Sequence, residues 1–152
     1  MTGKFTAFYQ SPIGCLVLTS DENSIISCDF GEEKEESEEL PPILKQALIQ
    51  LKQYFDGIRV RFDLKFTTNG TEFQETVWKE LLRIPYGETL SYTELALLIG
   101  DKNAVRAVGA ANGQNPISII IPCHRVIGAD GSLVGYGGGL EKKKWLLDFE
   151  KS

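Results

Sequence analysis

A turn cluster in the middle of the chain separates two stretches that differ in hydrophobic period. Before it, residues 59–66 alternate polar and apolar side chains, which predicts a strand with one buried face. The inward side chains would be Val60, Phe62, Leu64 and Phe66. After the cluster, apolar residues recur at steps of three and four, which is typical of amphipathic helices. The cluster itself, Thr67-Thr68-Asn69-Gly70, indicates a boundary. We therefore expect two domains, residues 1–68 and 69–152.

The first domain is predicted to combine a small antiparallel sheet with one helix. Residues 4–10, 14–19 and 25–30 are rich in β-forming side chains, which favours a hairpin or meander. Residues 41–57 predict a helix, because two prolines open the segment, apolar residues recur along one face and a glycine ends it. The predicted fold class is α+β: this sheet-plus-helix domain, followed by a helical, winged-helix-like domain that contains a helix-turn-helix.

The net charge of the chain comes from one short segment. The sequence has 16 basic and 21 acidic residues, a formal net charge of −5. Residues 32–39 contain six glutamates and one lysine, so this block alone has a charge of −5. Such a block is typically a solvated loop or a frayed helix end. Residues 69–152, with nine basic and ten acidic residues, have a net charge of only −1. The overall acidity therefore does not exclude a nucleic-acid partner.

Composition narrows the class of protein. No window holds about 18 consecutive apolar residues, and the first residues lack the apolar core of a signal peptide. We therefore expect a soluble, cytoplasmic protein with no membrane association. The cysteines, Cys15, Cys28 and Cys123, are odd in number and widely spaced, and His124 is the only histidine. Neither a disulfide framework nor a metal site is expected from this set.

Helix-start signals organise the second domain. Thr71 and Ser91 are each followed three residues later by Gln or Glu, the spacing of a capping box. A short helix is predicted over residues 92–99, and Asn103 is predicted to cap another over residues 104–112. Two short helices joined by a few residues form the outline of a helix-turn-helix.

The second of these helices consists almost entirely of small residues, and Arg106 is its only long polar side chain until its final residues. Its small residues are Ala104, Ala107, Gly109, Ala110 and Ala111. One interpretation is close packing against another helix. The other is that small side chains let the helix backbone settle deep in a DNA groove, with Arg106 as the probe.

Chemical groups gather at one point of the sequence. The β-branched run 117–121 predicts a strand buried on both sides, which ends at Pro122 and leads directly into Cys123. Next to this thiol stand the only imidazole, His124, and a cation, Arg125. Such neighbours activate a cysteine nucleophile, although a buried structural thiol is the alternative. The imidazole needs an orienting acceptor, and spacing alone leaves three acids of the last helix open, Glu141, Asp148 and Glu150.

These residues carry a resemblance to a known family. Residues 112–116 and 121–128, which include Pro122-Cys123-His124-Arg125-Val126, resemble the methylated-DNA–protein-cysteine methyltransferases, the O6-alkylguanine-DNA alkyltransferases. Residues 135–140 and 143–147 continue the likeness, which spans about residues 71–150. The first seventy residues resemble the family's N-terminal domain only in layout.

The resemblance implies DNA repair by direct damage reversal. The family binds double-stranded DNA through the minor groove, extrudes the alkylated guanine and transfers the O6-alkyl group irreversibly to its own cysteine. It implies the same transfer from O4-alkylthymine, one turnover per molecule, a monomer and no cofactor. Zinc in some relatives does not carry over, because residues 1–68 contain no histidine.

Roles follow by position from the resemblance. Cys123 would accept the alkyl group, and His124, through a water and oriented by Glu150, would take its proton. Tyr92 would donate to guanine N3, Arg106 would replace the flipped nucleotide, and Asn115 would brace the site. The implied DNA-binding residues are Tyr92, Arg106, Ala107, Gly109 and Ala110, and the implied base pocket is Val126, Tyr136, Gly137 and Gly138. Gly137 stands where many members have serine or alanine, which leaves only a backbone donor there.

Three other functions fit parts of the pattern. A non-catalytic damage-binding relative would share the fold but lack the acceptor, whereas Cys123 is present. A cysteine hydrolase would need a base from elsewhere in the chain, and there is no second histidine. A helix-turn-helix regulator with a redox-sensing Cys123 would bind one DNA sequence reversibly and would gain no mass from alkylated DNA.

Overall fold

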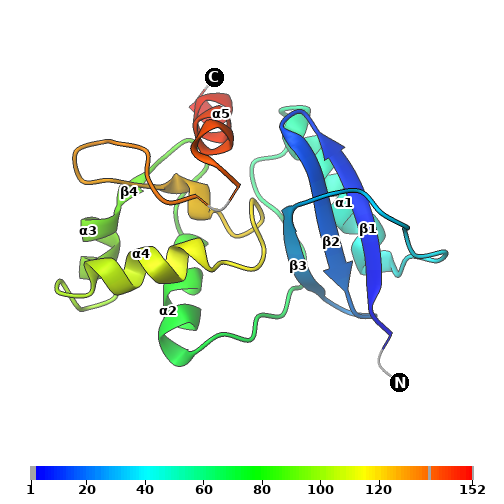
Figure 1. Cartoon of the computed structure of the whole chain (residues 1–152), viewed down its shortest axis with the longest axis horizontal. Coiled ribbons are helices and arrows are strands. Elements are labelled where there is room, and N and C mark those ends of the chain that lie inside the picture. The colour runs from blue at the N-terminus through cyan, green and yellow to red at the C-terminus, as the bar shows by residue number, and fades with distance from the viewer. Residues whose placement is uncertain (1–2, 137, 152) are drawn as a thin grey trace. The chain divides into compact units, whose positions relative to one another are not determined.

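The structure, a computed structural model, describes residues 3–136 and 138–151. The chain divides into two compact units, residues 1–68 and 69–152 (Figure 1). Within the described residues, no helix combines the length and the apolar character needed to cross a membrane.

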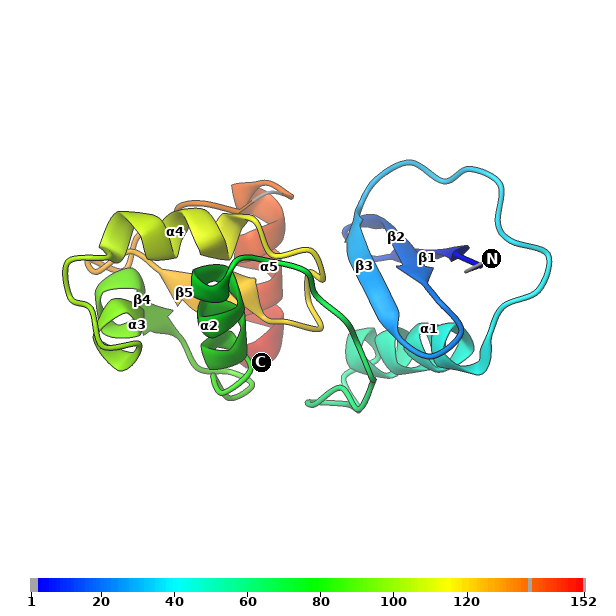
Figure 2. The same cartoon turned by 90° about the horizontal axis from the view of Figure 1, so that it is seen from below.

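The first unit is a three-stranded antiparallel sheet with one helix against it (Figure 2). The strands are β1 (Phe5–Ser11), β2 (Gly14–Ser20) and β3 (Ile25–Phe30), in that spatial order, and the helix is α1 (Pro42–Phe55). Side chains from both layers meet in a hydrophobic core. Its fully buried members are Ala7, Leu16, Leu18, Ile25, Cys28, Leu44, Ala47, Leu51 and Tyr54. The predicted meander and helix are confirmed.

The glutamate block between β3 and α1 is irregular and mostly exposed, as predicted for a solvated loop. Ser37 attaches it to the sheet. The backbone N–H of Ser37 donates to the carbonyl of Thr6 at 3.0 Å, and the N–H of Thr6 donates to Oγ of Ser37 at 2.9 Å. These bonds satisfy backbone groups on the outer edge of β1.

The strand predicted over residues 59–66 is wrong. Only Phe66 pairs with the sheet, through a single bridge to Ile25. The amide of Gln50, on α1, replaces a neighbouring strand: its Nε2 donates to the carbonyl of Asp63 at 3.0 Å, and its Oε1 accepts from the N–H of Asp63 at 2.9 Å. Val60, expected to point inward, is 59% exposed. A buried side-chain amide has taken the hydrogen bonds that alternation alone assigns to a ladder.

The second unit is helical, with one short parallel strand pair. Its elements are α2 (Glu72–Leu81), β4 (Leu90–Ser91), α3 (Tyr92–Leu98), α4 (Val105–Gly113), the 3₁₀ turn η1 (Cys123–Arg125), β5 (Val126–Ile127) and α5 (Leu140–Lys151). Leu90 pairs with Val126, so the start of α3 is tied to the residue that follows η1. Nε1 of Trp78, on α2, donates to the carbonyl of Ala111 at 2.8 Å and fixes α4. The α+β fold class with α3 and α4 as the helix-turn-helix pair is confirmed.

Two of the three predicted helix caps are present in the structure. At Thr71 and at Ser91 both reciprocal hydrogen bonds of a capping box are present. The prediction for Asn103 is wrong: α4 begins at Val105 after Ala104, and no side chain caps it. The N–H of Asn103 instead donates to Oδ1 of Asp101 at 3.0 Å, because an aspartate two residues earlier can close the turn by itself.

Candidate active site

The segment that leads into Cys123 is a tight turn rather than the predicted strand. The N–H of Ile121 donates to the carbonyl of Ile117 at 3.0 Å, and Ile119 has a φ of 72°. All five residues 117–121 are buried, so burial was predicted correctly but conformation was not. A β-branched residue in the left-handed region is strained, and the surrounding packing must hold it there.

Asn115 holds this turn closed. Its Oδ1 accepts from the N–H of Ile117 at 3.0 Å, and its Nδ2 donates to the carbonyl of Ile121 at 2.8 Å. Asn112, at the end of α4, adds a bond from its Nδ2 to the carbonyl of Cys123 at 3.2 Å. Both amides are buried. The base of the site is thus fixed by side-chain hydrogen bonds rather than by a sheet.

The Cys123–Arg125 segment itself is a buried 3₁₀ turn. Cys123 forms no disulfide bond and has only 5% of its surface exposed, and His124 is fully buried. Neighbouring side chains of an extended strand point to opposite faces, which would have kept the thiol and the imidazole apart. The helical turn removes that restriction.

Glu150, on α5, anchors this turn electrostatically. Nε2 of His124 lies 2.8 Å from its Oε2, and Nε of Arg125 donates to its Oε1 at 2.8 Å. Burial alone would raise the pKa of Glu150, but the hydrogen bonds from His124 and Arg125 outweigh burial and hold that pKa well below its usual range. Because the carboxylate is ionised and accepts only, Nε2 of His124 carries the proton. Of the three acids left open by spacing, the structure places Glu150 at the imidazole.

The other ring nitrogen of His124, Nδ1, is buried and has no hydrogen-bond partner within residues 3–136 and 138–151. Burial lowers the pKa of His124, against the opposing hydrogen bond and negative charge of Glu150. The imidazole is therefore neutral at pH 7, with its Nδ1 lone pair available. A neutral imidazole with a fixed tautomer is suited to take a proton.

Arg125 has a larger role than sequence reasoning gave it. Besides Glu150, it binds the carbonyl of Ile84 through Nη1 at 2.8 Å, and its guanidinium lies 5.7 Å from the ring centre of Tyr86. The residue is buried. Its position next to the cysteine and histidine was the available signal, but sequence did not show which acid it would pair with.

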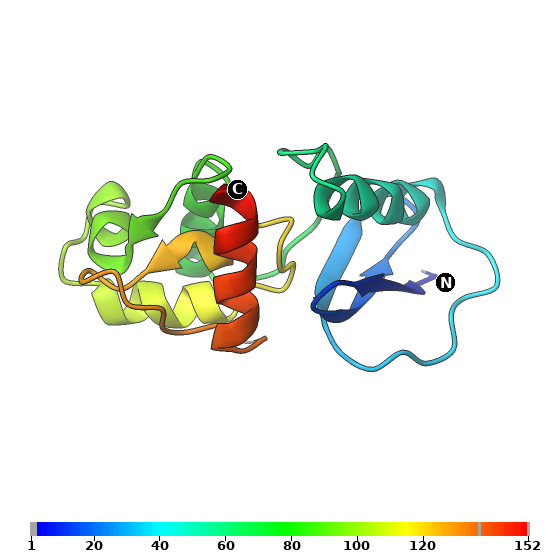
Figure 3. The ribbon, with the colours of Figure 1, turned by 90° about the horizontal axis from the view of Figure 1, so that it is seen from above.

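Lys143 corrects a further expectation. Three consecutive lysines, Lys142, Lys143 and Lys144, predict an exposed helical face, and this prediction holds for Lys144 but not for Lys143, whose exposure is 0%. Its Nζ donates to the carbonyls of Val126 and Val134. Burial lowers the pKa of Lys143 to about 8, and the charge of Cys123 acts in the opposite direction. The missed signal was helical spacing: Lys143 lies three, four and seven residues before Leu146, Leu147 and Glu150, which are buried on the same face of α5. This helix is drawn in red in Figure 3.

Tyr92 occupies the first turn of α3, beside the loop that follows β5. Its Oη donates to the carbonyl of Val134 at 3.0 Å, and burial raises its pKa. A Cβ at Gly109 of α4 would lie 3.8 Å from the Tyr92 ring, which is an ordinary van der Waals contact, so α4 packs close to this ring. Tyr136 and Gly138 are half-buried, Val126 is fully buried, and Gly137 lies outside the described residues.

One side of α4 is left open to solvent. Arg106, Ala107 and Ala110 are exposed, whereas Val108 and Ala111 are buried. The two readings of its small residues thus apply to different positions: Ala111 packs inside the unit, and Ala107 and Ala110 face outward.

Comparisons with known proteins decide the family. Residues 72–152 match the model of the 6-O-methylguanine DNA methyltransferase DNA-binding domain, and residues 4–68 match that of its ribonuclease-like domain. The chain belongs to the 6-O-methylguanine DNA methyltransferase family. A relative from Methanosarcina barkeri, named methylated-DNA–protein-cysteine methyltransferase, is 48% identical over 149 residues and is matched over 94% of each chain. One of the same name from Mycobacterium tuberculosis is 49% identical, covering 94% of this chain and 90% of the relative.

Solved structures of family members have the same architecture. The Mycobacterium tuberculosis O6-methylguanine methyltransferase matches with a TM-score of 0.89 and 46% identity, over 98% of this chain and 93% of that one. A structure from the same organism in complex with DNA matches with a TM-score of 0.87 and 47% identity, over 97% and 92% of the two chains. The family resemblance carried by the cysteine motif is confirmed, and it extends to the first domain.

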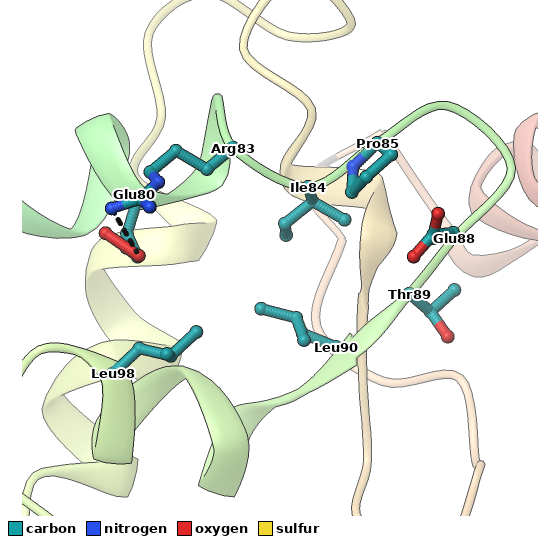
Figure 4. Close-up of a pocket in the computed structure, with 8 residues that line it drawn as sticks. All are labelled: Glu80, Arg83, Ile84, Pro85, Glu88, Thr89, Leu90 and Leu98. Atoms are coloured by element: carbon teal, nitrogen blue, oxygen red, sulfur yellow. Dashed lines mark ion pairs between the residues drawn. The ribbon is translucent and has the colours of Figure 1, made fainter.

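This member of the methyltransferase family also has a pocket of about 210 Å³ beside the end of α2 (Figure 4). Its lining residues are Glu80, Arg83, Ile84, Pro85, Glu88, Thr89, Leu90 and Leu98. None of the predicted site residues is among them. Within the described part of the chain, no three His, Cys, Asp or Glu side chains are grouped so as to hold a metal ion.

Proposed function

We propose that this protein repairs O6-alkylguanine in double-stranded DNA by transferring the alkyl group to Cys123. The observation that carries the proposal is the fixed arrangement of Cys123, His124 and Glu150 on one buried turn and one helix. Family membership supports the reaction class, and the related methyltransferase that was solved with DNA supports the partner. Cys123 occupies the acceptor position of the family motif.

The chemistry is a displacement at carbon. The sulfur of Cys123 attacks the alkyl carbon, an S–C bond forms, and the C–O6 bond breaks. The thiol proton passes through a bridging water to Nδ1 of His124, whose Nε2–H remains bound to Glu150. The electron pair of the broken C–O6 bond stays on O6 and is delocalised into the guanine ring, where Tyr92 donates a hydrogen bond to N3. The guanine anion then takes up a proton from water. A general base on one side and a donor on the other lower the barrier of such a step.

DNA would meet the exposed side of α4. Ala107 and Ala110 allow close approach of the helix backbone to the minor groove, and Arg106 can fill the space of the extruded base. Flipping a base costs a few kcal/mol, least where pairing is already weakened, as for an alkylated guanine. Val126, Tyr136, Gly137 and Gly138 would line the pocket that receives it.

The product limits the protein to one turnover. A thioether at Cys123 has no good leaving group, so the acceptor is consumed. O4-alkylthymine presents the same kind of alkyl–oxygen bond and would be a second substrate. We propose that the protein acts as a monomer in the cytoplasm, without a cofactor, in line with a transfer that needs only its own side chains.

Intact-mass measurement after incubation with a duplex that contains one O6-methylguanine tests this function. The expected result is a gain of one methyl group per molecule, mapped to Cys123 by peptide sequencing, with loss of the lesion. The half-exposed Cys15 is an internal control for non-specific alkylation and should stay unmodified. Cys123→Ser should bind the duplex without transfer. An unmodified Cys123 with an intact lesion contradicts the proposal and leaves a reversible DNA-binding regulator as the alternative.

A further inference from the structure

Two side chains from different helices donate to one backbone carbonyl in the loop that follows β5. Oη of Tyr92, in the first turn of α3, lies 3.0 Å from the carbonyl oxygen of Val134. Nζ of Lys143, on α5, lies 2.7 Å from the same oxygen. Nζ also donates to the carbonyl of Val126, in β5. A single buried ammonium therefore joins β5 to the loop segment 128–136, and Tyr92 shares one of its acceptors.

In this arrangement the hydroxyl of Tyr92 already donates its proton to the carbonyl of Val134. A phenol has one proton to donate, so the hydroxyl cannot bind Val134 and a guanine nitrogen at the same time. The contact is close: a Cβ at Gly135, whose φ is +66°, would lie only 2.9 Å from Oη of Tyr92. An incoming base must therefore exchange this hydrogen bond, and the carbonyl of Val134 must keep another donor if the loop is to stay in place.

We propose that Lys143 is a positioning residue that holds the carbonyl of Val134, and with it loop segment 128–136, when the hydroxyl of Tyr92 turns to the extruded base. This inference rests on the proposed function, in which Tyr92 assists the leaving guanine. Lys143 acts through Tyr92 and the loop and touches no reacting atom.

The surroundings of Lys143 suit this task. The residue is fully buried, and so is Val126, so neither the ammonium nor that carbonyl can turn to water instead. The ring of Tyr92 lies 5.7 Å from Nζ, which adds a cation–π attraction between the two donors. Without the ammonium, Tyr92 would be the remaining side-chain donor to Val134 within the described residues, and its release would leave that carbonyl without either donor.

A double-mutant cycle tests the inference. Lys143→Met removes the ammonium with little change in length, and Tyr92→Phe removes the hydroxyl. The readout is the first-order rate of alkyl transfer from free O6-benzylguanine to Cys123, which requires no DNA. We expect Lys143→Met to slow transfer about tenfold when Tyr92 is present, because the hydroxyl must then stay on Val134 and no longer reaches the base. In the Tyr92→Phe background this assistance is already lost, so the further slowing should be less than about twofold. Lys144→Met, a lysine lost from the exposed side of the same helix, is the matched control and should leave the rate unchanged.

Equal slowing by Lys143→Met in both backgrounds would mean that Lys143 only supports the fold, and it would overturn the inference. Absence of any slowing would overturn it as well. Thermal melting checks that each variant is folded, and if Lys143→Met is not, Lys143→Gln takes its place in the cycle, because its shorter and uncharged side chain weakens donation to both carbonyls. If the unaltered protein transfers no alkyl group, the proposed function fails and takes this inference with it. Transfer with additive losses contradicts the role of Lys143 alone.

Discussion

Oε2 of Glu150 lies 2.8 Å from Nε2 of His124, and the same carboxylate accepts two hydrogen bonds from Arg125. All three side chains are buried. One carboxylate thus sets the histidine tautomer and neutralises the arginine that flanks it. Breaking a buried pair by removing one partner leaves an uncompensated charge, which costs more than the pair itself contributes.

Glu150→Gln is therefore expected to lower the free energy of unfolding by about 3–5 kcal/mol, because Arg125 would be left buried without its counter-charge. Urea denaturation measures the change. Asp148→Asn, in the same helix, is the control: its carboxylate is 62% exposed and pairs only with the exposed Lys144, so a change of less than about 1 kcal/mol is expected. Equal losses in the two variants would refute a buried ion cluster.

Stability should fall on acidification, and the sign follows from two lowered pKa values. Burial lowers the pKa of His124, so below about pH 6.5 the unfolded chain binds a proton that the folded chain does not. Despite burial, the hydrogen bonds from His124 and Arg125 lower the pKa of Glu150, so its contribution is full above about pH 4.3 and is lost at lower pH. As the pH falls below about 6.5, the free energy of unfolding should decrease. The slope is up to about 1.4 kcal/mol per pH unit for each proton that the unfolded chain binds and the folded chain does not.

The pH dependence has a clean control, because His124 is the only histidine of the chain. In His124→Gln the slope between about pH 6.5 and 5 should largely disappear, whereas the steeper loss at lower pH should remain. Denaturation curves at a series of pH values provide the comparison. A variant that keeps the full slope above pH 5 would assign the titration to other groups.

Asn115→Ala removes two hydrogen bonds inside the turn that supports Cys123. The N–H of Ile117 and the carbonyl of Ile121 would both be buried without these partners, which predicts a loss of about 2–4 kcal/mol in unfolding free energy. Asn103→Ala is the matched control. The exposed Asn103 caps no helix in the structure, so its loss should stay within about 0.5 kcal/mol. If Asn103→Ala instead lowers the free energy of unfolding by about 1 kcal/mol, Asn103 acts as the helix cap that the sequence predicts.

Local signals predicted the elements whose partners lie within a few residues. The capping boxes at Thr71 and Ser91 were identified because both halves of each motif are three residues apart. The strand predicted at residues 59–66 was wrong because Gln50, which satisfies the backbone of Asp63, lies 13 residues away in the sequence. The strand predicted at residues 117–121 was wrong although its partner is near: Asn115 closes the segment into a turn, and β-branching alone contains no information about this contact.

In the candidate site, too, local sequence predicted some residues and missed others. The motif around Cys123 indicated the proposed nucleophile and base, but it could not choose among three acids in α5, because that choice depends on the rotation of a helix against η1. Lys143 was misplaced on the surface for the same reason. Its neighbours in sequence are charged, and only the helical period that it shares with Glu150 places it inside.

Arg106→Ala should separate damage recognition from chemistry. If Arg106 fills the space of the flipped base, its loss should slow repair of O6-methylguanine in a duplex about tenfold or more, since stacking of a side chain in nucleic acid contributes about 1–3 kcal/mol. Transfer from free O6-benzylguanine should be unchanged. Arg83→Ala removes the same charge from an exposed site near the end of α2 and should alter neither rate. Equal losses on both substrates would place Arg106 outside the base stack.

Salt dependence tests the mode of DNA binding as a whole. The exposed side of α4 presents small residues and Arg106, and the preceding turn adds only the exposed Lys102, so few phosphates are neutralised. With one to three phosphate contacts, the logarithm of the binding constant should fall with the logarithm of salt concentration with a slope of about −1 to −3. Lys102→Ala should reduce this slope by about one if that lysine binds phosphate. Binding titrations at several salt concentrations give the slope directly, and a value near −6 would require a broad basic surface instead of close contact by α4.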